Sequence, residues 1–183
     1  ASFRRLLDLE GDESYRILFL QGGASLQFAQ VPMNLATPGT GGDYVITGTW
    51  AKKAFQEAAR IGRPRAIWDG EEQGFTTLPD PRTLEVSREA AYLHIATNNT
   101  IFGTEFHELP APPPEVPLVG DMSSNILSEP LDVRRFGLIY AGAQKNLGPA
   151  GLGVVIIRSD LLERAPKNLP NILSYRAHVA AHG

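Results

Sequence analysis

The sequence has 183 residues, a net charge of −3, 43% hydrophobic and 20% charged residues, and no cysteine. This length suits a single domain, and the composition is that of an ordinary folded protein, which excludes a disordered chain and a strongly basic nucleic-acid-binding protein. The lack of cysteine excludes disulfides, thiolate metal sites and a cysteine nucleophile from this segment, and no apolar run approaches the length of a membrane span.

The two ends of the chain predict that it is part of a longer protein. Phe3, Leu6 and Leu7 have helical spacing and precede a glycine, which indicates the last turns of a helix whose beginning is missing. Neither Met nor a signal peptide begins the chain, and residues 174–183 lack a convincing terminal element. We therefore expect one domain over residues 1–183, truncated at both ends.

Two strand–helix units come first. Residues 15–20 predict a strand, and the turn "QGG" leads into a short helix from Ser25 to about Gln30, which Pro32 should stop. The second unit has a strand over 43–48 and an amphipathic helix over 51–62, whose inward face we expect to contain Ala51, Ala54, Phe55, Ala58 and Ala59.

Five further apolar segments predict buried strands, and a proline-rich segment at 109–117 predicts a surface crossover. Strands that alternate with helical segments indicate an α/β fold, which we expect to be a three-layer αβα domain with a mostly parallel sheet. The five predicted strands cover residues 65–70, 90–97, 117–121, 136–142 and 152–158.

Polar or aromatic residues follow the predicted strands where ligands gather in parallel α/β sheets, beyond the carboxyl ends. This placement predicts a single site built from several strand ends. The residues concerned are Gly22 to Ser25, Trp50, Thr100, Asp121 and Lys145.

The loop 22–25 lies between a strand and a helix, so the amides of Ala24 and Ser25 should point outward at the positive end of the helix dipole. A phosphate group fits there, and Ser25 adds a hydroxyl donor. A plain tight turn with a serine cap explains the same residues equally well. Nucleotide binding is disfavoured, because the loop lacks both a Gly-Lys-Ser/Thr ending and a G-x-G-x-x-G pattern.

Asp121 and Trp50 each have two interpretations. A carboxylate that closes an apolar strand is costly unless it meets a cation or several donors, but Asp121 could also simply cap the following helix. Trp50 could belong to the core, or it could offer a flat face to an aromatic ligand.

Lys145 stands in "YAGAQKNLGPAG", among small and apolar residues. We expect the backbone to pack closely around this lysine and remove it from water, which would make its free amine available as a nucleophile toward carbonyls. The alternative is a lysine that simply reaches outward from a loop.

Together these groups match the requirements of pyridoxal phosphate, which needs a phosphate site, a ring-stacking face, an acid for the pyridinium nitrogen and a Schiff-base lysine. In that case the lysine also acts as general base and acid, moving a proton between the substrate α-carbon and the cofactor.

The histidines give no metal site. His178 and His182 have the i, i+4 spacing of a metal pair, but the usual acid and a third ligand are missing, and a solvated tail explains them better. His94 is predicted to be a satisfied buried histidine, and His107 carries no readable signal. We predict no bound metal.

Two segments resemble the phosphoserine aminotransferase family, which is a fold-type I, class V group of pyridoxal-phosphate enzymes. They are "LFLQGGASLQFAQVPMNL" (18–35) and "DMSSNILSEPLDVRRFGLIYAGAQKNLGPAGLGVVIIR" (121–158). The resemblance implies the large, cofactor-binding domain of a cytoplasmic homodimer that transfers an amino group from glutamate to 3-phosphohydroxypyruvate, giving phosphoserine and 2-oxoglutarate in serine biosynthesis. The charge balance and the lack of a long apolar run favour neither a nucleic-acid nor a membrane partner.

The resemblance also implies a role for each site residue. Lys145 would be the Schiff-base lysine and Asp121 the partner of the pyridine nitrogen. Trp50 would stack on the ring and Thr100 would bond near its edge. The phosphate would be held by Ala24, Ser25 and Gln144.

Several family features are absent or altered. Asn99 stands where the family often has an acid, and the family's substrate-holding residues, part of them in a C-terminal small domain, are not in these 183 residues. Arg134 and Arg135 are better explained by a surface or interface role than as substrate anchors. Two alternatives stay open: another class V enzyme, such as an alanine:glyoxylate aminotransferase or a cysteine desulfurase, and a folded domain or dimerisation module without catalysis.

Overall fold

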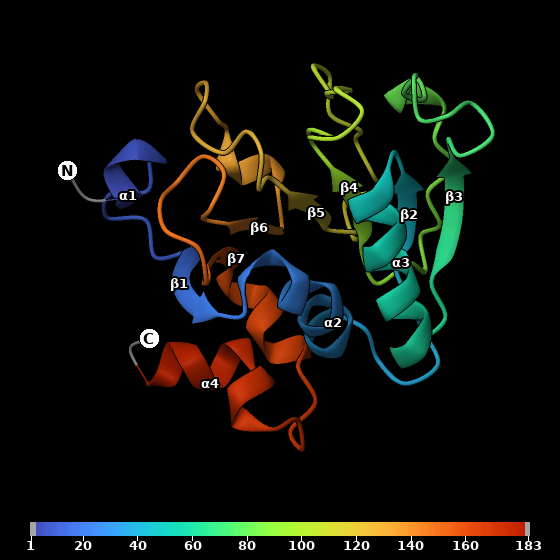
Figure 1. The fold of residues 1–183 in the computed structure, drawn as a ribbon. Helices are drawn as coiled ribbons and strands as arrows, with labels where there is room; N and C mark the ends of the chain where they lie inside the picture. The colour runs from blue at the N-terminus through green and yellow to red at the C-terminus, as the bar shows by residue number, and fades with distance from the viewer. Residues whose placement is uncertain (1–2, 182–183) are drawn as a thin grey trace.

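A computed structural model describes residues 3–181 and shows a twisted sheet with helices against one face (Figure 1). Within these residues the sheet has seven strands in the order β1-β7-β6-β5-β4-β2-β3. The strands are β1 (Tyr15–Gln21), β2 (Asp43–Ile46), β3 (Arg65–Asp69), β4 (Leu93–Ala96), β5 (Leu118–Asp121), β6 (Leu138–Gly142) and β7 (Leu152–Arg158). The α-helices are α1 (Phe3–Leu6), α2 (Gly23–Leu35), α3 (Thr49–Ile61) and α4 (Tyr175–Ala180).

The sheet is mostly parallel, which confirms the predicted α/β class. Strands β3, β2, β4, β5 and β6 pair in parallel, whereas β7 runs antiparallel to both β6 and β1. A single reversed strand leaves the carboxyl ends of β2, β4, β5 and β6 at one edge of the sheet. This edge is where the predicted site residues have to meet.

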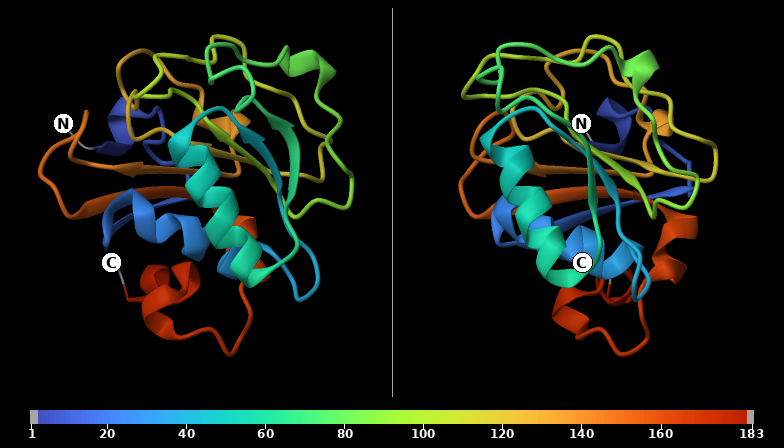
Figure 2. Two further views of the ribbon diagram at one scale, coloured as in Figure 1. Left: turned by 45° about the vertical axis from the view of Figure 1, so that its right-hand side comes forward. Right: turned by 90° about the vertical axis from the view of Figure 1, so that its right-hand side faces the viewer.

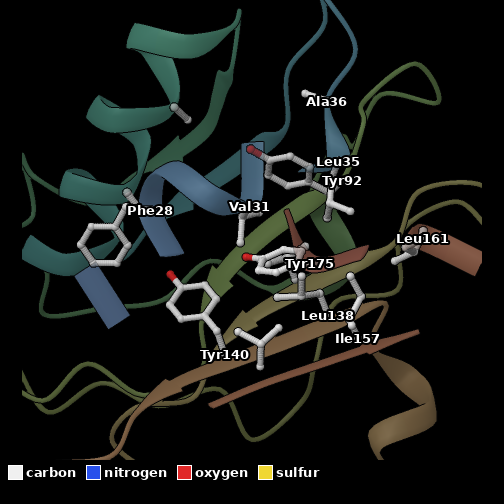
Figure 3. Packing of buried hydrophobic residues seen from close by; sticks show 14 of the residues in the cluster. Phe28, Val31, Leu35, Ala36, Tyr92, Leu138, Tyr140, Ile157, Leu161 and Tyr175 are labelled. Atoms are coloured by element: carbon white, nitrogen blue, oxygen red, sulfur yellow. The ribbon is translucent and has the colours of Figure 1, made fainter. Parts of the chain in front are cut away.

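Both faces of the central strands β2, β4, β5 and β6 are buried, as their continuous apolar sequences predict. One face packs against α2 and α3, and side chains of α2 such as Phe28 and Val31 point toward Tyr140 and Leu138 of β6 (Figure 3). The opposite face is covered by α1, short 3₁₀ turns and the long connecting loops, coloured green to orange in Figure 2.

The prediction that Pro32 ends the first helix is wrong. Helix α2 runs 13 residues from Gly23 to Leu35, and Pro32 lies inside it. Proline removes one helical hydrogen bond, but the side chains of Phe28, Val31 and Pro32 are buried in this helix. Burial against the sheet therefore outweighs the local preference of proline.

Two predictions of burial need correction. Strand β3 forms as expected but is largely exposed, because it is the outermost strand of the sheet. In α3, Ala51, Ala54 and Ala58 are buried as predicted, whereas Ala59 is exposed. Positions 51, 54 and 58 follow the 3.6-residue period closely, and Ala59 has rotated beyond the contact stripe.

The terminal elements are short. Helix α1 ends at Leu6, and Leu7 is buried although it follows the helix. Near the C-terminus, where no convincing element was expected, the Ser174 hydroxyl accepts from the Ala177 amide and caps α4. Between residues 3 and 181 no helix is long and apolar enough to cross a membrane.

Candidate functional site

A small pocket lies at the shared carboxyl edge of the parallel strands. Its walls come from the loop after β2, the start of α3, the loop after β4, the end of β5 and the turn after β6. The lining residues are Gly48, Trp50, Ala51, Ala96, Asn98, Asn99, Asp121, Ser124 and Lys145. The structure thus brings together three of the residues that the sequence singled out, namely Trp50, Asp121 and Lys145.

Asp121 is buried at the base of this pocket, with 8% of its surface exposed. The Ser123 amide and hydroxyl donate to Asp121 Oδ1 at 3.0 and 2.6 Å, and the Ser123 hydroxyl in turn accepts from the Gly142 amide at 2.9 Å. The carboxylate therefore caps a turn, in place of the helix that the simpler interpretation proposed, and also faces the pocket. Burial raises the pKa of Asp121, against the opposing effects of the Ser123 hydrogen bonds and the Lys145 charge.

The Lys145 ammonium is hydrogen-bonded to two hydroxyl groups. It donates to Thr100 Oγ1 at 2.5 Å and to Ser124 Oγ at 3.4 Å, and these two hydroxyls bond each other. Thr100 is therefore placed beside the amine, although it does not line the pocket.

The expected burial of Lys145 is wrong. Residues 144–146 and 148–151 are exposed, because they form a turn beyond β6 instead of packing on the core. Glycine and alanine bury little apolar area, so nothing in this segment draws it inward. The amine is held by hydroxyl groups at the mouth of the pocket, without removal from water.

Trp50 lies in the first turn of α3 and is partly buried against the helix-side core. Lys53 Nζ lies 4.8 Å and Lys145 Nζ lies 5.5 Å from the centre of its ring. Both ammonium groups are within cation–π range. The indole thus serves the core and the pocket together, so both interpretations of Trp50 apply.

The N-terminus of α2 lies next to β6 and β7. A Cβ at Gly142 would be 3.3 Å from Ala24 Cβ and 2.7 Å from Gln144 Oε1, and a Cβ at Gly153 would be 3.1 Å from the Gly23 carbonyl. Glycine at these positions allows the close approach. Ala24 and Gln144 therefore flank Gly142, beside the serine that holds Asp121.

Ser25 does not cap α2. The N-cap is Gly22, which has no side chain to bond the first amides, and its φ of 90° favours glycine. Ser25 is exposed within the first turn. The simpler interpretation of a serine cap therefore fails, and the first amides of α2 carry no side-chain cap.

Sequence reasoning missed two serines of the site and gave no role to Asn99. Ser123 orients Asp121, Ser124 contacts Lys145, and the Asn99 amide donates to the Thr47 carbonyl just before α3. The serines were visible in "DMSSN", where they suggested only a cap. The donation to a carbonyl explains why an amide is useful at Asn99, since an ionised acid there could not donate.

Other polar candidates lie elsewhere. Arg134 pairs with Asp8 and Asp12, and Arg135 donates to the Leu109 carbonyl, so both arginines serve surface contacts. His178 is partly buried and bonds the Ile172 carbonyl, and His182 lies outside the described residues. Over residues 3–181, no three His, Asp or Glu side chains cluster in a way that could hold a metal.

The known proteins that this chain resembles include aminotransferases. Residues 5–171 match the family described as aminotransferase class-V. A phosphoserine aminotransferase of Geobacillus kaustophilus is 55% identical over 175 residues, which cover 96% of this chain and 48% of that protein.

Solved structures agree with this match. The phosphoserine aminotransferase from Bacillus circulans subsp. alkalophilus superposes with a TM-score of 0.91 at 49% identity, over 97% of this chain and 49% of that chain. The PLP-bound phosphoserine aminotransferase from Trichomonas vaginalis gives a TM-score of 0.82 at 39% identity, over 98% of this chain and 50% of that chain. The chain spans about half the length of the curated relatives it matches. It belongs to the class-V aminotransferase family.

Proposed function

We propose that residues 1–183 form the pyridoxal-phosphate-binding domain of a phosphoserine aminotransferase. The reaction moves an amino group from glutamate to 3-phosphohydroxypyruvate and yields 2-oxoglutarate and phosphoserine. The observation that carries the proposal is the convergence of Lys145, Asp121 and Trp50 on one pocket, from three different strand ends. The high identity to phosphoserine aminotransferases supports the choice of substrate.

The chemistry of the pocket fits the cofactor. An amine, a buried carboxylate and an indole face line one pocket, at the strand ends where α/β sheets bind ligands. The uncapped start of the 13-residue helix α2 adjoins Gly142, next to the serine that holds the carboxylate. When bound, pyridoxal phosphate supplies an aldehyde and an electron-accepting ring for transamination.

Lys145 would hold the aldehyde carbon and then act as general base. Thr100 and Ser124 accept hydrogen bonds from its ammonium, and they fix the nitrogen at the mouth of the pocket. A held amine can take a proton from the substrate α-carbon and deliver it to the cofactor carbon that had carried the aldehyde, which is the proton movement that transamination requires.

Asp121 would hold the pyridine nitrogen in its protonated form. Its carboxylate is fixed by Ser123, and Ser123 is itself fixed by the Gly142 amide. A buried acid with this support does not need to reorganise when charge develops in the ring.

The remaining residues would position the cofactor. Trp50 would stack on the ring, and its own orientation is supported by α3 and by the Lys53 ammonium. The phosphate would bind the amides of Ala24 and Ser25 at the positive end of the α2 dipole, with Gln144 beside them.

Substrate comparison on the full-length protein tests this function. We expect a kcat/KM for 3-phosphohydroxypyruvate at least 100-fold above that for pyruvate or glyoxylate, because a bound phosphate adds several charge-assisted hydrogen bonds. Equal rates with unphosphorylated keto acids would favour another class V aminotransferase. No turnover with any keto acid, despite bound cofactor, would favour the folded domain without catalysis.

We also propose that the protein works as a homodimer in the cytoplasm. Support comes from the family resemblance alone, and size-exclusion chromatography with light scattering tests the dimer. A monomer at micromolar concentration would contradict it.

A further inference from the structure

A row of buried side chains from β4, β6 and β5 ends at Asp121. His94 on β4 and Tyr140 on β6 flank the strand that carries Asp121, and His94 Nε2 lies 2.9 Å from the Tyr140 hydroxyl, across β5. Asp121 and Tyr140 are direct partners in the β5–β6 register, and the Tyr140 hydroxyl is among the groups that lower the pKa of the Asp121 carboxyl. His94, Tyr140 and Asp121 therefore form one path of neighbouring side chains that ends at the candidate pocket.

This path is closed to water. His94 is 2% exposed and Tyr140 is fully buried. The titratable and charged groups that face it are the rings of Tyr44, which stacks on His94 at 4.7 Å, and Tyr175, and the ammonium of Lys145 beyond Asp121. Within the described residues Lys145 is the cation whose charge lowers the pKa of the Asp121 carboxyl, and it lies on the pocket side.

The direction of the hydrogen bonds follows from counting protons. A tyrosine hydroxyl has one proton, so if Tyr140 donates to the carboxylate it has to accept from His94. His94 then carries its proton on Nε2, and Nδ1 is left as a lone pair. In agreement, Nδ1 is buried and has no partner among the described residues.

The opposite direction has two defects. If Tyr140 donated to His94, its oxygen lone pairs would face a carboxylate, which is repulsive. The histidine proton would then sit on Nδ1, as a buried donor without an acceptor. Burial lowers the pKa of His94 to about 3, which keeps the ring neutral and removes the third possibility, in which both nitrogens are protonated.

We propose that Tyr140 is a positioning residue that keeps the Asp121 carboxylate ionised and aimed at the pocket, while His94 fixes the direction of the Tyr140 hydroxyl. The value of an ionised Asp121 rests on the proposed function, in which this carboxylate holds a protonated pyridine nitrogen. The hydrogen-bond direction itself does not depend on any ligand.

The tautomer of His94 is the first test. Long-range ¹H–¹⁵N correlation spectra of the full chain, labelled with ¹⁵N-histidine and recorded near pH 7 without cofactor, report which ring nitrogen carries the proton. We expect His94 to be protonated on Nε2 alone. A proton on Nδ1 would overturn the proposal, and this measurement needs no variant.

The ionisation of Asp121 is the second test. In Tyr140→Phe we expect the pKa of Asp121, followed by its ¹³C carboxyl shift, to rise by about one pH unit, because a hydrogen bond to the charged form is lost. The matched control is Tyr175→Phe, which removes another fully buried hydroxyl that bonds Gln27 instead. An unchanged Asp121 titration in Tyr140→Phe, or an equal change in both variants, would overturn the role of Tyr140.

These tests are separate from the proposed function. They are made without cofactor, so a chain that fails to bind pyridoxal phosphate at Lys145 but shows the expected tautomer and titration refutes only the function. A chain that binds cofactor but shows the Nδ1 tautomer refutes only the positioning chain.

Discussion

The Lys145 ammonium donates to the Thr100 hydroxyl at 2.5 Å and so joins the turn after β6 to the loop after β4. Because Lys145 is exposed, this contact and the one to Ser124 hold the amine in place. Hydroxyl groups at the pocket mouth therefore position the amine.

Removal of the Thr100 hydroxyl should weaken cofactor retention. In Thr100→Val the amine loses an acceptor at constant side-chain shape, and a single hydrogen bond contributes about 1 kcal/mol, so we expect about a fivefold higher Kd for pyridoxal phosphate. Absorbance titration measures this Kd. Thr76→Val is the control, since Thr76 bonds only the Gln73 carbonyl on the surface, and an equal effect in both variants would refute the role of Thr100.

Neutralisation of Asp121 should stabilise the fold while it removes the cofactor's partner. The folded-state pKa of Asp121 is raised above the ordinary 3.8 by burial, so its ionisation destabilises the fold as pH rises through that folded-state pKa. We expect Asp121→Asn to melt at a higher temperature than the unmodified chain at pH 7, with the difference shrinking as pH falls toward 4. Differential scanning calorimetry across this range measures it.

Asp160 is the control, because the pKa of its carboxyl is shifted in the opposite direction from that of Asp121. Its hydrogen bonds to Arg158 lower the pKa of its carboxyl, so it contributes stability that is present above pH 4 and lost as pH falls through the folded-state pKa. Asp160→Asn should therefore not raise the melting temperature at pH 7. A lower melting temperature in Asp121→Asn than in the unmodified chain would contradict the assignment of a costly buried charge.

The buried His94 should make stability fall in mild acid. Its folded-state pKa is about 3 because of burial, against an ordinary value of 6.5, so the unfolded state binds more protons between these values. The free energy of unfolding should then fall by up to about 1.4 kcal/mol per pH unit below pH 6.5 from this group. Urea unfolding at pH 7, 6 and 5 measures the slope.

Substitutions show whether His94 causes this dependence of the unfolding free energy on pH. His94→Gln should flatten it, whatever its effect on stability at pH 7, whereas His107→Gln should leave it unchanged because His107 is exposed. An unchanged slope in His94→Gln would show that other groups control acid stability.

Asn34 should be essential for docking the C-terminal segment on α2. Its amide donates to the Leu173 carbonyl at 2.8 Å and accepts from the Tyr175 amide at 2.9 Å, in a buried position. Asn34→Ala leaves the Tyr175 amide unpaired and leaves the Leu173 carbonyl with only the longer bond from Gln30 at 3.4 Å, so we expect a loss of about 2 kcal/mol in unfolding free energy. Denaturant unfolding compares it with Asn168→Ala at an exposed position, and similar losses would contradict this role.

The sequence could predict which residues meet at the site, but only part of how they meet. The carboxyl ends of parallel strands share one edge, so Trp50, Asp121 and Lys145 could be placed together from strand prediction alone. The contacts from Thr100 and Ser124 to Lys145 join segments far apart in the chain, and no local pattern indicates such pairs. The path through His94 and Tyr140 crosses an intervening strand and depends on sheet order.

The errors also have physical causes. Pro32 lies inside α2 because tertiary burial outweighs a local preference. Lys145 was expected to be buried because its neighbours are small and uncharged, but smallness is not a driving force for burial. Strand β3 could not be recognised as an edge strand, since strand order does not follow from apolar composition.

The central claim is that Lys145 is the cofactor lysine, and reductive labelling tests it most directly. The full chain is incubated with pyridoxal phosphate, reduced with borohydride, digested and mapped by mass spectrometry, with Lys145→Arg as the control. We predict the label on Lys145 and its loss in the control. Label on Lys52, Lys53 or Lys167 in place of Lys145, or equal labelling in Lys145→Arg, would contradict the account.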